Sequence, residues 1–184
     1  MEMQLLALVQ PSEKHETLVM DYRRELLDAG ENVIHGAPLL EEFEDYSQWL
    51  RLARCDFSVS PKTKGWVDAT TLLALSERGD RMVGIVNIRH ELTEYLQKFG
   101  GHIGFSVCPS ERRRGYASDI LLQALDYCKQ ELGIAEIMAN CYADNEASRR
   151  TIVKCGGVLE CERLYEDGKP MQVYWIKLGD APAS

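Results

Sequence analysis

The sequence lacks several features that would assign it to a common class of protein. It has no run of about 18 apolar residues, so no membrane-spanning helix is predicted. Its short N-terminal apolar stretch has no basic region ahead of it, unlike a secretory signal peptide, and we therefore expect a cytoplasmic protein. Basic residues are in the minority, with 21 Lys and Arg against 29 Asp and Glu. The formal net charge of -8 argues against general nucleic-acid binding, which needs a basic face for phosphates.

Metal-ligand and nucleotide-binding motifs are also missing. The six cysteines form no Cys-x-x-Cys pair, and the four histidines form no cluster with the spacing of metal ligands. We therefore predict neither a zinc site nor a disulfide framework, and we expect most thiols to be reduced and buried. No P-loop stretch of the type Gly-x-x-x-x-Gly-Lys-Ser/Thr occurs. No repeat or low-complexity segment divides the chain, so residues 1–184 are predicted to form a single domain.

The most informative stretch that is present runs from Glu111 to Leu125, ERRRGYASDILLQAL. Before it, residues 102–107 place an apolar side chain at every second position, which predicts a strand packed on one face. After it, apolar residues recur at helical spacing as far as Leu132. The start of a helix has unpaired backbone N–H groups and partial positive charge, and Gly115 allows the backbone to approach a ligand closely. This turn is therefore predicted to bind an oxyanion such as phosphate.

The other predicted elements give a mixed α/β order. Apolar alternation and β-branched content predict strands at residues 3–9, 67–76, 82–89, 102–107, 134–141, 158–165 and 171–178. Helical spacing predicts helices over residues 11–30, 41–54 and 92–99, from the turn to residue 132, and over 145–155. Residues 55–66 have the composition of a loop, which is a candidate flap on the substrate side. This order differs from the regular alternation of parallel β-α-β units.

The spacing Arg112-x-x-Gly115-x-Ala117 resembles the pyrophosphate-binding signature of the GNAT superfamily of acyl-CoA-dependent N-acetyltransferases. A little-characterised bacterial group of GNAT proteins has stretches similar to GGHIGFSVCPSERRRGYA, residues 100–117. The resemblance covers nearly the whole chain. It implies a GNAT-like α/β fold with a mixed, mostly antiparallel central sheet of about six to seven strands, flanked by about four to five helices.

A second part of the chain supports this resemblance. Members of the family commonly begin the helix after the next strand with Asn, followed by a small residue three positions later, and have Lys and Gly near the helix end. Here these are Asn145, Ser148, Lys154 and Gly156. Asn is also a good helix cap, so Asn145 has a structural role whether or not a cofactor binds.

The resemblance implies acetyl-CoA as acyl donor and no metal. Val107 and Cys108 would offer backbone groups to the pantetheine arm and the thioester carbonyl. Asn145 would contact the arm, and Ser148 is a further candidate for this contact. The pyrophosphate would be held by backbone N–H groups, with arginine side chains free for the outer phosphates, over the residues Arg112, Arg113, Arg114, Gly115, Tyr116, Ala117 and Ser118.

The general acid and the general base depart from the family pattern. Many members have a tyrosine acid seven residues after the Asn, but this position is Ile152, so Tyr142 is the candidate acid and Tyr116 a second one. Some members have a glutamate base on the strand before the signature, and His102 is the nearest titratable group to that place. An unperturbed pKa of about 6.5 suits a base, and the alternative is a hydrogen-bonded structural histidine. His90 and Glu91 are weaker candidates.

Three functions remain open. The first is an N-acetyltransferase that moves an acetyl group from acetyl-CoA to a primary amine by direct attack in a ternary complex. Its acceptor would be a small-molecule amine or a protein amine, and the acidic charge favours a cationic one. The second is a non-catalytic acyl-CoA-binding sensor or partner module, and the third is a phosphate-binding α/β protein of another kind. Exposed strand edges near the C-terminus also suggest a possible homodimer.

Overall fold

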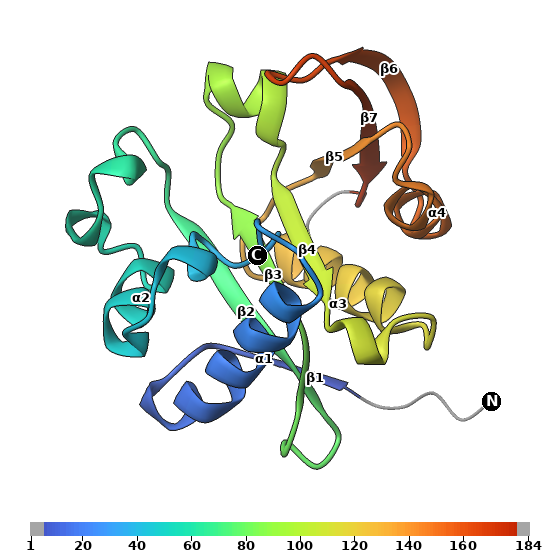
Figure 1. The fold of residues 1–184 in the computed structure, drawn as a ribbon. Coiled ribbons are helices and arrows are strands. Elements are labelled where there is room, and N and C mark those ends of the chain that lie inside the picture. The colour runs from blue at the N-terminus through green and yellow to red at the C-terminus, as the bar shows by residue number, and fades with distance from the viewer. Residues whose placement is uncertain (1–5, 180–184) are drawn as a thin grey trace.

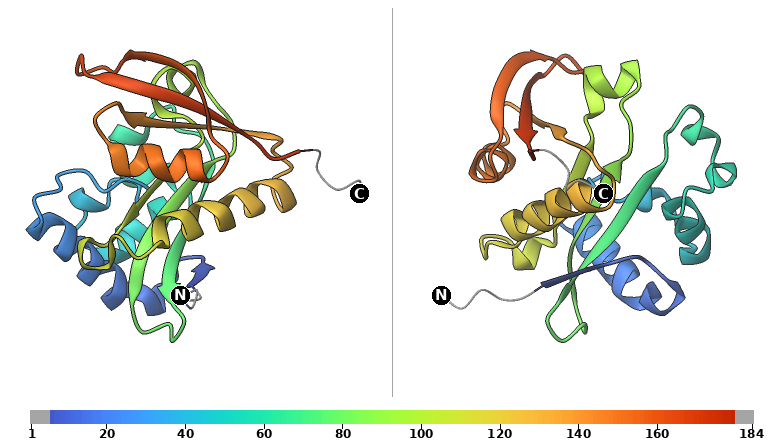
Figure 2. Two further views of the ribbon diagram at one scale, coloured as in Figure 1. Left: turned by 90° about the vertical axis from the view of Figure 1, so that its right-hand side faces the viewer. Right: turned by 180° about the vertical axis from the view of Figure 1, so that it is seen from behind.

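The computed structural model describes residues 6–179, which form a seven-stranded sheet covered by helices on both faces (Figures 1 and 2). The strands in chain order are β1 (Leu6–Val9), β2 (Ala69–Ser76), β3 (Met82–Arg89), β4 (Ile103–Val107), β5 (Glu136–Tyr142), β6 (Val158–Leu164) and β7 (Pro170–Lys177). Their order across the sheet is β1-β2-β3-β4-β5-β7-β6. Every neighbouring pair is antiparallel except β4 and β5, which are parallel. The predicted mixed, mostly antiparallel sheet is therefore confirmed.

Four α-helices cover the sheet, as Figure 2 shows from two sides. They are α1 (Glu16–Asp28), α2 (Tyr46–Ala53), α3 (Tyr116–Gln130) and α4 (Glu146–Lys154), and a π-helical turn, η5, spans Leu96–Gly100. Short 3-10 turns lie at Glu13–His15, Leu40–Glu42, Phe57–Val59, Pro61–Thr63 and Pro109–Glu111. Helices α1 and α2 pack on one face of the sheet, and α3 and α4 pack on the other. None of the helices within residues 6–179 combines the length and hydrophobicity needed to cross a membrane.

Strand β2 shows how the two faces are built. Leu72 and Ala74 pack in the core beneath α3, whereas Leu73 and Leu75 pack in the core beneath α1 and α2. Because both faces of this strand are buried, its sequence is a nearly continuous apolar run rather than an alternating one.

The predicted helix over residues 41–54 is shorter than expected and begins only at Tyr46. The side chain of Asp45 accepts a hydrogen bond from the backbone N–H of Ser47 (2.8 Å), and this cap fixes the start of α2. The preceding Phe43 is extended and separates the helix from the turn at Leu40–Glu42. Trp49 is fully buried, so the aromatic stripe of this helix belongs to the core.

Strands β4 and β5 separate soon after they meet, which Figure 1 shows near the centre of the molecule. The only residues that pair between them are Ile103 and Ala139, next to a backbone hydrogen bond from His102 N–H to Met138 O (2.8 Å). Beyond this point the carboxyl half of β4 has β3 as its only strand partner. The sheet is therefore split on one side of β4.

Strand β6 forms one edge of the sheet. Three of its large apolar side chains, Val158, Leu159 and Leu164, are exposed. Such an edge is a suitable surface for pairing with a second copy, but homodimer formation stays a prediction.

The connection between α1 and α2 crosses the sheet at Gly36. A Cβ atom at this glycine would lie 2.7 Å from the carbonyl oxygen of Gly104 and 2.8 Å from the Cα of Phe105. The backbone of Gly36 has φ +82, a left-handed conformation that favours glycine. Gly30, at the end of α1, has φ +84, but a Cβ atom added there would have no neighbour within 4 Å, so it is a matched control.

We predict that Gly36→Ala destabilises the protein far more than Gly30→Ala. The left-handed backbone alone costs about 1–2 kcal/mol at either position. At Gly36 the clash with the backbone of β4 adds about 1–3 kcal/mol, because well-packed strands cannot move aside without strain. Chemical denaturation of both variants measures the difference, and equal losses would show that the crossing is not tightly packed.

Candidate active site

The turn between β4 and α3 has the backbone geometry of an anion site. Arg113 (φ 63) and Gly115 (φ 89) both adopt left-handed conformations, and Gly115 caps α3. The backbone N–H of Ser118 donates to the carbonyl oxygen of Gly115 at 3.0 Å, which closes the first helical turn. The N–H groups of Arg113, Gly115 and Ala117 donate to no acceptor within residues 6–179. These donors, at the positive end of a 15-residue helix, suit a phosphate.

The three arginine side chains of this turn are not equally available. Arg112 pairs with Glu31 at 2.5 Å, and its Nε donates to the carbonyl oxygen of Val107 at 3.1 Å. Arg114 pairs with Glu111. Only Arg113 has no side-chain partner in the described part of the chain. The expectation that all three side chains are free for phosphates is therefore corrected, because nearby carboxylates already bind two of them.

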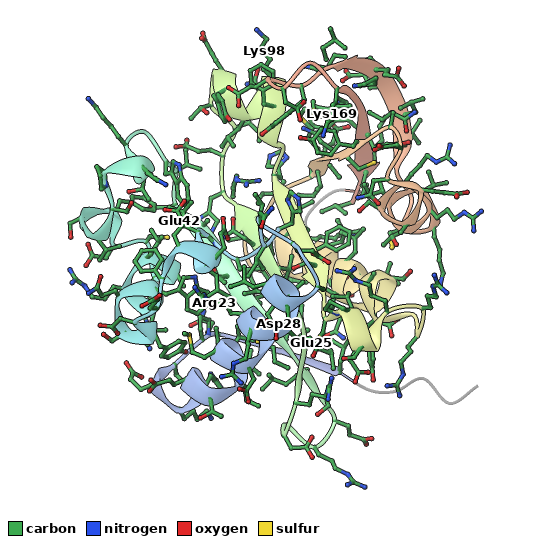
Figure 3. The ribbon with its side chains drawn as sticks, viewed as in Figure 1. Arg23, Glu25, Asp28, Glu42, Lys98 and Lys169 are labelled. Atoms are coloured by element: carbon green, nitrogen blue, oxygen red, sulfur yellow. The ribbon has the colours of Figure 1, made fainter. Side chains whose placement is uncertain are left out.

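Two carboxylates hold this turn against the rest of the fold. Glu111, of which only 9% of the side chain is exposed, contacts Arg81 at 2.8 Å as well as Arg114. Glu25 on α1, labelled in Figure 3, accepts a hydrogen bond from the backbone N–H of Ser110 at 2.8 Å. Removal of an arginine that pairs with a buried carboxylate strongly destabilises the fold. This network therefore fixes the position of the turn.

The split beside β4 exposes backbone groups to the gap. The register with β3 directs the N–H and C=O groups of Phe105 and Val107 away from β3, toward the side where β5 has left. The N–H of Cys108, by contrast, donates to Val83 O at 2.9 Å, and its C=O accepts from Glu111 N–H at 2.9 Å. Of the two residues predicted for the pantetheine arm, Val107 therefore has a backbone N–H facing the gap, while the backbone groups of Cys108 are already bonded.

A cavity of about 210 Å³ lies between the diverging strands. Its wall includes Phe105, Asn140, Tyr142, Asn145, Ser148 and Tyr165. The Oδ1 of Asn145 accepts a hydrogen bond from the N–H of Ser148 at 3.1 Å and so caps α4. This leaves the Nδ2 of Asn145 as a hydrogen-bond donor without a partner in the described residues. Two of the predicted cofactor residues, Asn145 and Ser148, thus lie at the cavity.

Asn140 is a polar residue of this cavity that the sequence did not single out. Its Nδ2 and Oδ1 are both buried, and neither has a hydrogen-bond partner in the described residues. Buried amides are nearly always bonded, and an exception needs an explanation such as a ligand. In the sequence, Asn140 could have been recognised as an amide in the middle of the mostly apolar strand EIMANCY, residues 136–142.

His102 lies outside the wall of this cavity. Its Nδ1 accepts a hydrogen bond from the backbone N–H of Met138 at 2.9 Å, so the proton of the neutral ring is on Nε2. The ring packs edge to face against Trp175, with ring centres 6.3 Å apart. Burial, together with the positive charge of Arg89, lowers the pKa of His102 to about 4. This geometry favours the structural role that the sequence left open.

Tyr142 lies at the cavity with its hydroxyl bonded to another residue. The hydroxyl donates to Asp167 Oδ2 at 3.0 Å, and Lys169, labelled in Figure 3, lies over the ring at 5.6 Å. Burial and the hydrogen bond to Asp167 raise the pKa of Tyr142 to about 12. The hydroxyl is therefore protonated at neutral pH, as a proton donor must be. The second candidate acid, Tyr116, is buried in the core at the start of α3.

A larger cavity of about 850 Å³ adjoins the smaller one. The segments 52–67 and 93–100 contribute much of its wall, so the loop predicted as a substrate-side flap does border a cavity. Both cavities include Arg89 and Tyr165 in their walls. The two cavities therefore meet at these residues. No group of three or more His, Cys, Asp or Glu side chains within residues 6–179 is arranged to hold a metal ion.

Comparisons with solved structures identify the same fold. RimL, an α-N-acetyltransferase of a ribosomal protein in complex with coenzyme A, has a TM-score of 0.66 and 16% identity, with 95% of each chain covered. A mutant form of the spermidine N-acetyltransferase SpeG from Vibrio cholerae has a TM-score of 0.61 and 16% identity, again with 95% of each chain covered. At these identities the similarity shows the fold alone.

Sequence comparisons place the chain in a family. An uncharacterized N-acetyltransferase of Bacillus subtilis (strain 168), YoaA, is 36% identical over 100 residues, which cover 51% of this chain and 54% of that protein. The chain thus matches about half the length of this curated relative. The family model described as an acetyltransferase (GNAT) domain matches residues 10–158. With this match over most of its length, and with the split sheet and the helix-capping turn in place, the chain belongs to the GNAT acetyltransferase family.

Proposed function

We propose that this protein transfers an acetyl group from acetyl-CoA to the primary amine of an acceptor by direct attack in a ternary complex. The observation that carries the proposal is the order of three features along the split in the sheet: the turn at residues 112–117, the unpaired edge of β4 that leads to it, and the cavity beside Asn140. Each part of this path offers groups that match one part of acetyl-CoA. The relatives named above act on amines, which supports an amine acceptor.

The groups along the split support binding of the pyrophosphate and the pantetheine arm of the donor substrate. We propose that the N–H groups of Arg113, Gly115 and Ala117 hold the pyrophosphate, with the Arg113 side chain near an outer phosphate. The N–H of Val107 and the Nδ2 of Asn145 are proposed donors to the amide-rich pantetheine arm. Arg112 would then act by holding the end of β4 in place rather than by contacting phosphate.

The chemistry requires little covalent participation by the protein. The amine nitrogen attacks the thioester carbon, a C–N bond forms, the C–S bond breaks, the nitrogen loses a proton and the sulfur gains one. We propose that Asn140 Nδ2 donates to the carbonyl oxygen as negative charge develops on it, since a donor fixed in advance stabilises the transition state. Tyr142 is the proposed proton donor to the sulfur, after its hydroxyl leaves Asp167.

The alternative is a non-catalytic module that binds acyl-CoA. Ile152, at the position where many family members have the tyrosine acid, is 1% exposed and packs in the core beneath α4. No hydroxyl is therefore available at that place. Binding of acetyl-CoA without acetylation of any amine in a broad panel of small amines and peptides would favour this alternative.

The first measurement is a calorimetric titration with acetyl-CoA. We expect micromolar binding by the wild-type protein and none by Gly115→Glu, because the carboxylate would repel the phosphates at the turn. The matched control is Gly115→Ala, which keeps the left-handed strain but adds no charge, and a Cβ here would meet no atom within 4 Å. Because a methyl group at this position would also lie close to the phosphates, the control should bind more weakly than the wild type but more tightly than Gly115→Glu. Absence of binding by folded wild-type protein would contradict the proposal.

Asn145 can be tested for a role beyond capping. Asn145→Asp keeps an oxygen that caps α4, so stability should change by less than about 0.5 kcal/mol, whereas Asn145→Ala should cost about 1 kcal/mol. The aspartate lacks the Nδ2 donor, so we expect its acetyl-CoA affinity to fall about tenfold, the value of one hydrogen bond. An unchanged affinity in Asn145→Asp would leave the cap as the only role of this side chain.

His102→Asn distinguishes a catalytic-base role of His102 from a structural one. The asparagine cannot act as a base, but its side-chain oxygen can accept the hydrogen bond from Met138 N–H in place of Nδ1. The folded pKa of about 4 lies below the unfolded value, so the stability contributed by neutral His102 is present above pH 6.5 and is lost as pH falls toward 4. Between pH 6.5 and 5 the wild type should lose about 1–2 kcal/mol more stability than the variant, measured by chemical denaturation. We expect turnover to change less than about threefold. A loss of about 100-fold with intact acetyl-CoA binding would instead support the base role.

A further inference from the structure

Arg89 is a partly buried cation without a carboxylate partner in the described residues. It ends β3, and its Nη1 donates to the carbonyl oxygens of Gly100 (3.3 Å) and Gly101 (3.1 Å). It takes part in none of the ion pairs formed within residues 6–179. Burial lowers the pKa of its guanidinium. The three remaining N–H donors, on Nε and Nη2, have no partner in the described residues and are not fully buried, so an anion in the adjoining cavities can reach them.

The position of Arg89 matters because the two cavities meet there. Its side chain forms part of the wall of both the larger and the smaller cavity, together with Gly100 and Tyr165. An anion bound by the free N–H groups would therefore lie at the passage between them. The rest of that molecule would extend either toward Asn140 or into the larger cavity.

The charges around the larger cavity favour an anionic rather than a polycationic acceptor. Its charged wall residues are Lys62, Lys64 and Arg89 against a single carboxylate, Glu94. Lys62 is partly neutralised by Glu42, which lies 2.8 Å away and is labelled in Figure 3, but Lys64 and Arg89 have no such partner in the described residues. The cavity is thus locally positive in a chain of net charge -8.

The uncharged part of the wall of the larger cavity suits an apolar group of a ligand. Leu52, Phe57, Trp66 and Tyr95 contribute to it, and Trp66 is 40% exposed although it stacks edge to face on Phe57 at 6.3 Å. A volume of about 850 Å³ is in the range of sites for small molecules. An acceptor with one negative group and a large apolar side chain matches both features.

We propose that the acceptor is a small aminocarboxylic acid with a large apolar side chain, whose carboxylate is bound by Arg89. In an α-amino acid the amine and the carboxylate are attached to the same carbon, so an arginine that binds the carboxylate would place the amine at the passage into the smaller cavity, whose wall includes Asn140. This inference rests on the proposed acetyl transfer and names its substrate class. As the C–N bond forms the amine loses a proton, and as the C–S bond breaks the sulfur gains one.

The test compares each acid with its own amide, which keeps the amine and the apolar body but lacks the charge. Phenylalanine, leucine, methionine and tryptophan and their amides are titrated calorimetrically into protein saturated with coenzyme A, and their acetylation is followed with acetyl-CoA by release of free thiol. We expect the wild type to prefer the acids by about tenfold or more in affinity and in kcat/KM. Spermidine should be a poor acceptor.

Three variants make the test specific to Arg89. Arg89→Gln retains a donor for the glycine carbonyls but not the charge, so the acid-to-amide ratio should fall to about one while acetyl-CoA affinity is kept. Arg89→Lys, which keeps the charge without the planar fork, should give an intermediate ratio. Lys64→Gln removes an exposed cation from the same cavity and should change the ratio less than about threefold.

Several results would contradict the proposed acceptor class without contradicting the proposed acetyl transfer. These are a wild-type preference for the amides or for spermidine, an acid-to-amide ratio that survives Arg89→Gln, and absence of binding by every acid at millimolar concentration while acetyl-CoA still binds. Failure of the wild type to bind acetyl-CoA would remove the proposed function and this inference with it. Retained acetyl-CoA affinity also shows that the Arg89 variants are folded.

Discussion

The separation of β4 from β5 is the feature on which the candidate site depends. A strand inside a sheet normally bonds to neighbours on both sides, but β4 meets β5 only at Ile103 and then continues with β3 alone. The N–H groups of Phe105 and Val107 are left facing a gap rather than a partner. Unpaired backbone donors are costly when they are shielded from water, so a ligand that contains amides is a favourable occupant. The same gap leaves the amide of Asn140 without a partner.

Carboxylates hold the candidate anion-binding turn at the end of this gap. Three arginines follow one another there, yet Glu31 and Glu111 each bind one of them, and Glu25 bonds the preceding backbone. These ion pairs connect the turn to α1 and to the β2–β3 hairpin. In the proposed site, phosphate recognition would thus be left mainly to backbone N–H groups, whose direction is fixed by the helix, and to the single side chain of Arg113.

The net charge of the chain and the local charge of the larger cavity favour different acceptors. The acidic composition favoured a cationic acceptor, but the larger cavity has more cations than carboxylates in its wall. Long-range attraction is screened by salt within about 10 Å, whereas the field inside a partly closed cavity is set by the few groups that line it. Under the proposed function, Arg89 is therefore expected to influence the choice of acceptor more than the net charge of the chain does.

The sequence by itself determined the elements and the family. Apolar periodicity predicted the strand at residues 102–107 and the helix after it, because that signal is local, and the Arg-x-x-Gly-x-Ala spacing marked the anion turn for the same reason. Only the tertiary structure decided which side chains are available. His102 accepts a hydrogen bond from Met138, and Arg112 pairs with Glu31, partners that are 36 and 81 residues away in the chain. Such contacts depend on strand register and helix packing, which no local pattern specifies.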